Sequence, residues 1–130
     1  MRFLRSSSLG LAALLLCPGA TAFAQSDTLA KIKASGAITI GSRDSQIPFS
    51  YKPGGSADPV GFSNDVCLKI VDAVKARLGM PKLEVRYTTL TSTNRIPLLT
   101  NGTVDLGSAT TTNTVQRQQP VDFAPCHCVT

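Results

Sequence analysis

The sequence contains little of what catalysis or metal binding requires. Its only histidine, His127, lies between Cys126 and Cys128, a spacing that does not let side chains converge on one zinc ion. It has no glycine-rich phosphate-binding loop and no visible pair of nucleophile and general base. The aspartates, Asp44 and Asp105 among them, show no pairing typical of an acid–base couple. We therefore expect no metal, no cofactor and no catalysis.

Long apolar segments are also missing. Residues 9–16 form an apolar run, but it is shorter than the roughly 20 residues of a membrane-spanning helix. Arg2 and Arg5 precede this run, and the small-residue stretch 21–24 follows it, a pattern typical of a secretory signal peptide. We predict that residues 1–24 are a cleaved signal peptide, with an uncleaved membrane anchor as the alternative.

Charge of either sign is sparse in the rest of the chain. Without residues 1–24, the 13 basic residues fall to 11 against 8 acidic ones, a net charge of +3. The charges are scattered, with no lysine–arginine block and no interleaved aromatic residues, which argues against nucleic-acid binding.

Residues 25–130 are enough for one domain of about 100 residues and too few for two. They contain three cysteines, Cys67, Cys126 and Cys128. Because this number is odd, at least one thiol must stay free or pair with another chain in an oxidising compartment.

Hydrophobic periodicity predicts alternating helices and strands. The clearest helix is 64–78, for which Ser63 or Asn64 can cap the start and Gly79 marks the end. The predicted helices are 28–36, 64–78, 94–100 and a short turn at 115–119. The predicted strands are 37–41, 83–88 and 104–107, with a brief extended piece at 48–51 inside the loop 42–59. This order predicts an α/β domain with a parallel sheet, because parallel neighbours need crossover helices.

Arginines and hydroxyl residues follow the predicted strands. Arg43 comes just after the first strand, Arg95 lies in the segment beyond the second, and the polar run 110–113 follows the third. Ligands of open parallel sheets bind outside the carboxyl ends of the strands. Arginine suits a carboxylate because its planar donors bind two oxygens at once. Taken alone, the pattern favours solvated surface arginines, and a carboxylate site is the alternative.

The chain resembles a known family at these residues, the periplasmic solute-binding proteins (family 3) of amino-acid ABC transporters, especially the glutamate/aspartate binders. The matching segments are 28–38, 41–51, 60–65, 91–99, 101–105 and 111–117. The resemblance implies the first lobe of a type II periplasmic-binding-protein fold, in which an amino acid is held in a cleft between two lobes that close by hinge bending.

The family resemblance also assigns ligand-binding residues. It implies that Arg43 and Arg95 contact ligand carboxylates, that hydroxyls add hydrogen bonds, and that Arg117 supports the α-carboxylate. The hydroxyl residues are Ser92, Thr110 and Thr112, whereas Phe49 and Tyr51 are packing residues or cleft wall. The implied protein is a periplasmic monomer that delivers glutamate or aspartate to a membrane permease.

The chain departs from the family in two places. A cysteine that relatives carry after the third strand is missing from Gly107-Ser108-Ala109-Thr110, so Cys67 has no assured partner. The second lobe is absent, and we expect residues 25–130 to be an incomplete first lobe of a truncated copy that binds poorly alone. A periplasmic enzyme on the same scaffold, resembling a dehydratase, and a non-binding remnant are the alternatives. A sensor domain fused to a membrane segment is a third alternative, which the sequence favours less.

Overall fold

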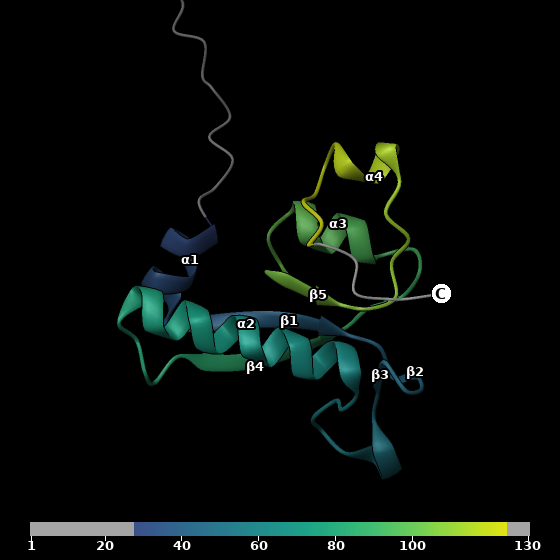
Figure 1. The fold of residues 1–130 in the computed structure, drawn as a ribbon, viewed down its shortest axis with the longest axis horizontal. Coiled ribbons are helices and arrows are strands. Elements are labelled where there is room, and N and C mark those ends of the chain that lie inside the picture. The colour runs from purple at the N-terminus through teal and green to yellow at the C-terminus, as the bar shows by residue number, and fades with distance from the viewer. Residues whose placement is uncertain (1–27, 125–130) are drawn as a thin grey trace, which may run out of the picture.

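The computed structural model describes residues 28–124 and contains a small parallel sheet with helices on both faces (Figure 1). The predicted signal peptide and Cys126, His127 and Cys128 lie outside the described residues. The helices are α1 (Thr28–Ser35), α2 (Phe62–Leu78), α3 (Arg95–Thr100) and α4 (Val115–Gln118), with a 3-10 turn η1 (Pro53–Gly55). The strands are β1 (Ala37–Ser42), β2 (Ser45–Gln46), β3 (Ser50–Tyr51), β4 (Glu84–Thr89) and β5 (Leu106–Ser108).

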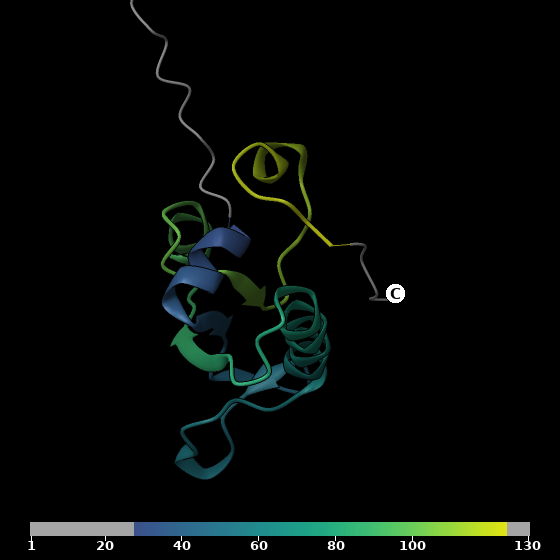
Figure 2. The same ribbon diagram turned by 90° about the vertical axis from the view of Figure 1, so that its left-hand side faces the viewer.

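The main sheet has the order β4-β1-β5, and both pairings are parallel, as predicted. Ile40 in the central strand β1 pairs with Tyr87 of β4 on one side and with Leu106 of β5 on the other. Helix α2 packs along one face, whereas Leu99 of α3 lies beside Gly107 on the opposite face (Figure 2). The two crossovers therefore run on opposite sides of the sheet. No helix among residues 28–124 is both long and apolar enough to cross a membrane.

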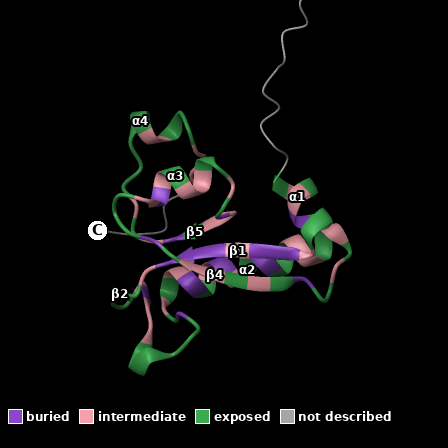
Figure 3. Cartoon of the chain, turned by 180° about the vertical axis from the view of Figure 1, so that it is seen from behind, coloured by how far each residue is buried: buried purple, intermediate pink, exposed green. Residues whose placement is uncertain are grey.

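The hydrophobic core lies between the sheet and α2, where the purple residues of Figure 3 gather along β1. Alternation in β1 and helical spacing in α2 bring the apolar residues to the same layer. The buried members are Ile32, Ile38, Ile40, Cys67, Val71 and Leu83. Helix α2 contributes Cys67 and Val71 to this core.

Cys67 is a free, buried thiol in the part of the chain that the structure describes. Burial raises its pKa to about 11, and the neighbouring Ser108 hydroxyl lowers it in part. A thiol with this pKa is almost wholly protonated at neutral pH, so Cys67 behaves as a small core residue.

Helix α2 begins differently from the prediction. Neither Ser63 nor Asn64 is the cap; the N-cap is Gly61, at φ 119°, and no side chain caps the helix. Instead, the first two backbone N–H groups of α2 donate to the carbonyl oxygens of Pro48 and Phe49, at 3.1 and 2.8 Å. A Cβ at Gly61 would lie 2.6 Å from each of these oxygens, so only glycine fits. The C-terminal prediction is confirmed, since Gly79 ends α2 in the left-handed conformation.

The third strand also differs from its predicted range. The segment 104–107 was predicted, whereas β5 spans Leu106–Ser108. Val104 is 1% exposed, but its N–H donates to the carbonyl oxygen of Leu98 in α3, at 2.9 Å, rather than to β1. The backbone at Val104 is therefore bound to α3 before pairing with β1 begins.

Asp105 connects three elements just before β5. Its carboxylate, 3% exposed, accepts from the backbone N–H of Thr39 in β1 at 2.9 Å and from Lys31 Nζ of α1 at 2.7 Å. Lys31 also donates to the carbonyl oxygen of Gly102. One side chain thus fixes the start of β5 against β1 and holds α1 in place.

Candidate carboxylate-binding site

The carboxyl ends of the three strands lie at one edge of the sheet. Ser42, the last residue of β1, pairs with Thr89 at the end of β4 and with Ser108 at the end of β5. Because all three strands are parallel and end in register, the segments that follow them leave the sheet side by side. The predicted convergence of Arg43, Arg95 and the threonine run at this edge is therefore confirmed at the level of the backbone.

Arg43 is half-buried directly after β1. Its backbone N–H donates to Ser50 Oγ at 2.9 Å, and its Nη1 donates to the carbonyl oxygen of Leu90 at 3.1 Å. The side chain lines a shallow pocket of about 360 Å³ formed by residues 43–45 and 89–92. The remaining N–H groups of the Arg43 guanidinium make no hydrogen bond within residues 28–124, so they can bind a ligand.

Arg95 is the first residue of α3 and is only 6% exposed, so a solvated surface arginine is the wrong interpretation here. Its guanidinium joins two loops. Nε donates to the carbonyl oxygen of Thr91 at 3.2 Å, and Nη2 donates to Ser92 Oγ at 3.3 Å. Nη1 donates across to the other loop, to the Thr110 carbonyl oxygen at 2.8 Å and to Thr111 Oγ1 at 2.9 Å.

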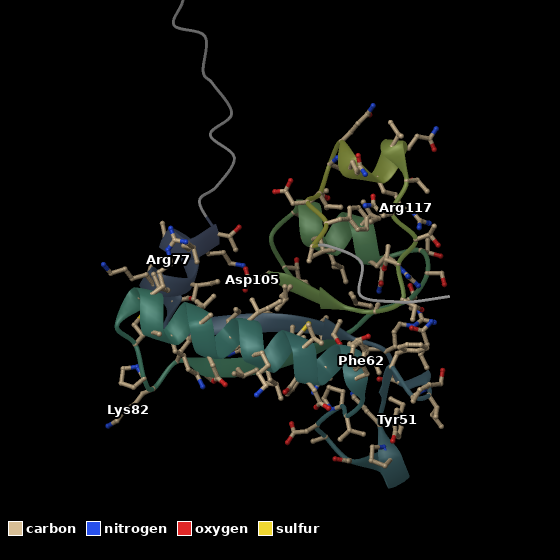
Figure 4. The ribbon with its side chains drawn as sticks, viewed as in Figure 1. Tyr51, Phe62, Arg77, Lys82, Asp105 and Arg117 are labelled. Atoms are coloured by element: carbon tan, nitrogen blue, oxygen red, sulfur yellow. The ribbon has the colours of Figure 1, made fainter. Side chains whose placement is uncertain are left out.

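Arg117 lies in the short helix α4, whose N-cap Thr114 accepts from the Arg117 backbone N–H. Its side chain is half-buried, and its Nη1 donates to the carbonyl oxygen of Thr112 at 3.0 Å. Figure 4 shows Arg117 on the α3–α4 side of the molecule, well away from Tyr51 in strand β3. The packing or cleft-wall role of Tyr51 stays a prediction.

The three arginines form a positively charged cluster. Burial, then the charge of Arg43, then that of Arg117 lower the pKa of the Arg95 guanidinium below its usual value. No ion pair formed within residues 28–124 involves any of the three. The nearby Asp44 carboxylate is instead 3.4 Å from Lys52 Nζ. A cluster of this kind is stabilised by an anion, and a carboxylate matches the guanidinium geometry.

The predicted hydroxyl residues surround the cluster in different ways. Ser92 lines the pocket and its oxygen accepts from Arg95, which leaves its proton free to be donated. Thr110 and Thr112 hold the arginines through carbonyl oxygens, and their exposed hydroxyls make no hydrogen bond within the described chain. Sequence reasoning missed Thr111, whose hydroxyl accepts from Arg95.

The rest of the described chain offers no competing chemistry. No group of three or more histidine, cysteine, aspartate or glutamate residues within 28–124 could hold a metal ion. A larger depression of about 520 Å³ lies at the end of α2, where Asp72 and Lys75 are paired at 3.8 Å. It lacks the convergent donors of the arginine cluster.

Comparisons with known proteins agree with the fold. The family described as bacterial extracellular solute-binding proteins, family 3, matches residues 38–130. The chain is 48% identical over 117 residues to the L-glutamate/L-aspartate-binding protein of Pseudomonas aeruginosa, covering 90% of this chain and 39% of that protein. The chain therefore spans less than half the length of this curated relative.

Two solved structures show the same fold. A receptor for L-cysteine of Neisseria gonorrhoeae matches with a TM-score of 0.60 at 33% identity, covering 75% of this chain and 37% of that one. A mutant of domain 1 from TmArgBP of T. maritima, in its arginine-bound form, matches with a TM-score of 0.55 at 26% identity. That match covers 70% of this chain and 64% of the solved chain. These type II periplasmic binding proteins confirm the predicted fold class.

Proposed function

Since this chain belongs to family 3 of the bacterial extracellular solute-binding proteins, we propose that it binds an acidic amino acid, glutamate or aspartate, through its arginine cluster. The observation that carries the proposal is the meeting of Arg43, Arg95 and Arg117 at one sheet edge without an acidic partner in the described chain. The name of the Pseudomonas aeruginosa relative supports the choice of ligand.

Charge explains why an acidic ligand fits better than a neutral one. Glutamate and aspartate carry two carboxylates, and the three guanidinium groups offer enough donors to bind both. Arg43 and Arg117 each use one side-chain N–H within residues 28–124 and present the others. Ser92, Thr110 and Thr112 supply the remaining hydrogen bonds from their hydroxyls. An amide side chain, as in glutamine, would leave part of the positive charge uncompensated.

A single lobe is enough for binding in this proposal. The arginine-bound domain 1 from TmArgBP supports it, because one domain of that protein holds an amino acid. A lobe without closure leaves the ligand charges exposed to water, which weakens every electrostatic contact. We therefore expect this lobe alone to bind more weakly than a two-lobed protein would.

The physiological role proposed for the protein is delivery. The protein acts in the periplasm as a monomer and passes the amino acid to the permease of an ABC transporter. Among residues 28–124, the site combines arginines and hydroxyls and offers no acid–base couple, which favours binding over the dehydratase-like alternative.

Isothermal titration of the purified chain with glutamate, aspartate, glutamine and arginine tests the proposal. We expect heat from the two acidic amino acids and at least tenfold weaker binding of glutamine, because an amide forfeits a charge-assisted pair. Arginine, which adds a cation to a cationic cluster, should give no heat. Preference for glutamine or arginine over both acidic ligands would refute the proposal.

A further inference from the structure

We propose that Thr111 is a positioning residue of the binding site: its hydroxyl helps to fix the orientation of the Arg95 guanidinium, so that the unused N–H of Nη2 is presented to a carboxylate. Thr111 is outside the set of ligand-binding residues assigned by family resemblance. This inference rests on the proposed function, because it names the residue that prepares Arg95 for its ligand.

The hydrogen bonds of Arg95 show which donors are committed. An arginine side chain has five N–H groups, and four of those on Arg95 are used within the described chain. Both N–H groups of Nη1 point to the segment after β5, one to the Thr110 carbonyl oxygen and one to Thr111 Oγ1. Nη2 keeps one N–H unused within residues 28–124. Nη2 is therefore the nitrogen that a carboxylate can reach.

Thr111 is the acceptor that keeps Nη1 in this place. The Thr110 carbonyl alone can hold only one Nη1 hydrogen in good geometry, and the 2.9 Å bond to Thr111 Oγ1 holds the second. Without it, three hydrogen bonds remain and Nη1 is held by the Thr110 carbonyl oxygen alone, so the guanidinium is fixed less firmly. Because ordering a long side chain costs conformational entropy, a ligand would then have to supply that ordering itself.

The exposure of the threonine run separates Thr111 from its neighbours. Thr110 and Thr112 are exposed, whereas Thr111 between them is half-buried. The Thr111 hydroxyl accepts from Arg95, whereas the hydroxyls of its exposed neighbours make no hydrogen bond within the described chain. The hydroxyls of Thr110 and Thr112 are thus free to bind a ligand, and the hydroxyl of Thr111 positions Arg95.

Substitutions at Thr111 test the proposal in the full chain. Thr111→Val keeps the shape and removes the acceptor, and Thr111→Ser restores it. We expect glutamate to bind Thr111→Val about tenfold more weakly, as for the loss of one hydrogen bond to a charged group. Thr111→Ser and the control Thr103→Val, which alters an exposed threonine whose hydroxyl makes no hydrogen bond among residues 28–124, should bind within about twofold of the unsubstituted chain.

A ligand-free measurement separates this inference from the proposed function. In ¹⁵N NMR spectra, a held guanidinium gives resolved Nη–H signals, and rotation averages them. We expect resolved Arg95 signals in the unsubstituted chain and in Thr111→Ser, and signals broadened by faster rotation in Thr111→Val, with Thr111→Ala as a second test if the valine variant does not fold. Unchanged Arg95 signals without the hydroxyl would overturn the positioning role. Absence of glutamate binding by the unsubstituted chain would overturn the proposed function. The NMR comparison would then still decide whether Thr111 positions Arg95.

Discussion

Replacement of Asp105 by alanine tests how the start of β5, the strand that leads to the binding site, is held. The substitution removes a carboxylate that is 3% exposed and accepts from the Thr39 N–H at 2.9 Å and from Lys31 Nζ at 2.7 Å. A hydrogen bond to a charged group contributes about 1.5–3 kcal/mol when buried. The Lys31 side chain is 39% exposed, so solvent screening reduces its pair to about 1 kcal/mol or less.

The two contributions predict a loss of about 2–4 kcal/mol in the free energy of unfolding. Asp105→Asn keeps an oxygen that can accept from Thr39 but loses the charge, so it should cost about half as much. Urea unfolding followed by circular dichroism measures both variants. Asp72→Ala is the matched control, because Asp72 is 72% exposed and 3.8 Å from Lys75.

The control substitution should change the free energy of unfolding by less than about 0.5 kcal/mol. A loss for Asp105→Ala no larger than that for Asp72→Ala would refute the reasoning that a buried, shared carboxylate joins α1, β1 and β5. A loss in Asp105→Asn as large as in Asp105→Ala would show that charge, rather than the hydrogen bond to Thr39, dominates.

Two further predictions concern backbone strain and pH. Gly61→Ala should lower the free energy of unfolding in urea by roughly 3 kcal/mol or more, because its Cβ would lie 2.6 Å from two carbonyl oxygens at φ 119°. Gly36→Ala, at φ 67° with open space around the position, should lower it by about 1–2 kcal/mol. Equal losses in the two variants would contradict the steric argument. Because folding raises the pKa of Cys67 from 9.0 to about 11, the stability from this thiol is complete below pH 9 and is lost as the pH rises towards 11. The unsubstituted chain should lose roughly 2 kcal/mol more than Cys67→Ala over that interval, and parallel curves would contradict it.

The topology was predictable because it depends on hydrophobic patterns that can be read directly from the sequence. The apolar spacing of α2 and the short β-branched run of β1 determine a helix and a buried strand, and their alternation requires parallel pairing. The start of α2 was not predictable in the same way. It depends on Gly61 and on two carbonyl oxygens from the preceding loop, whose position only the folded chain defines.

The binding site was predictable in composition but less so in geometry. Arg43 and Arg95 could be placed at the sheet edge because they follow parallel strands. The burial of Arg95 and its four hydrogen bonds could not, because they depend on how two loops approach each other in space. Thr111 is one of three consecutive threonines, and the sequence alone does not show which of them turns inward.

The central claim is that the arginines at this edge hold a ligand carboxylate, and titration of Arg43→Ala/Arg95→Ala with glutamate tests it most directly. The matched control is Arg77→Ala/Lys82→Ala, which also removes two positive charges but at the far end of the molecule (Figure 4). We predict glutamate heat from the unsubstituted chain and from the control, and none from the arginine variant once circular dichroism has shown it to be folded. Equal binding by both variants, or no binding by the folded, unsubstituted chain, would contradict the account.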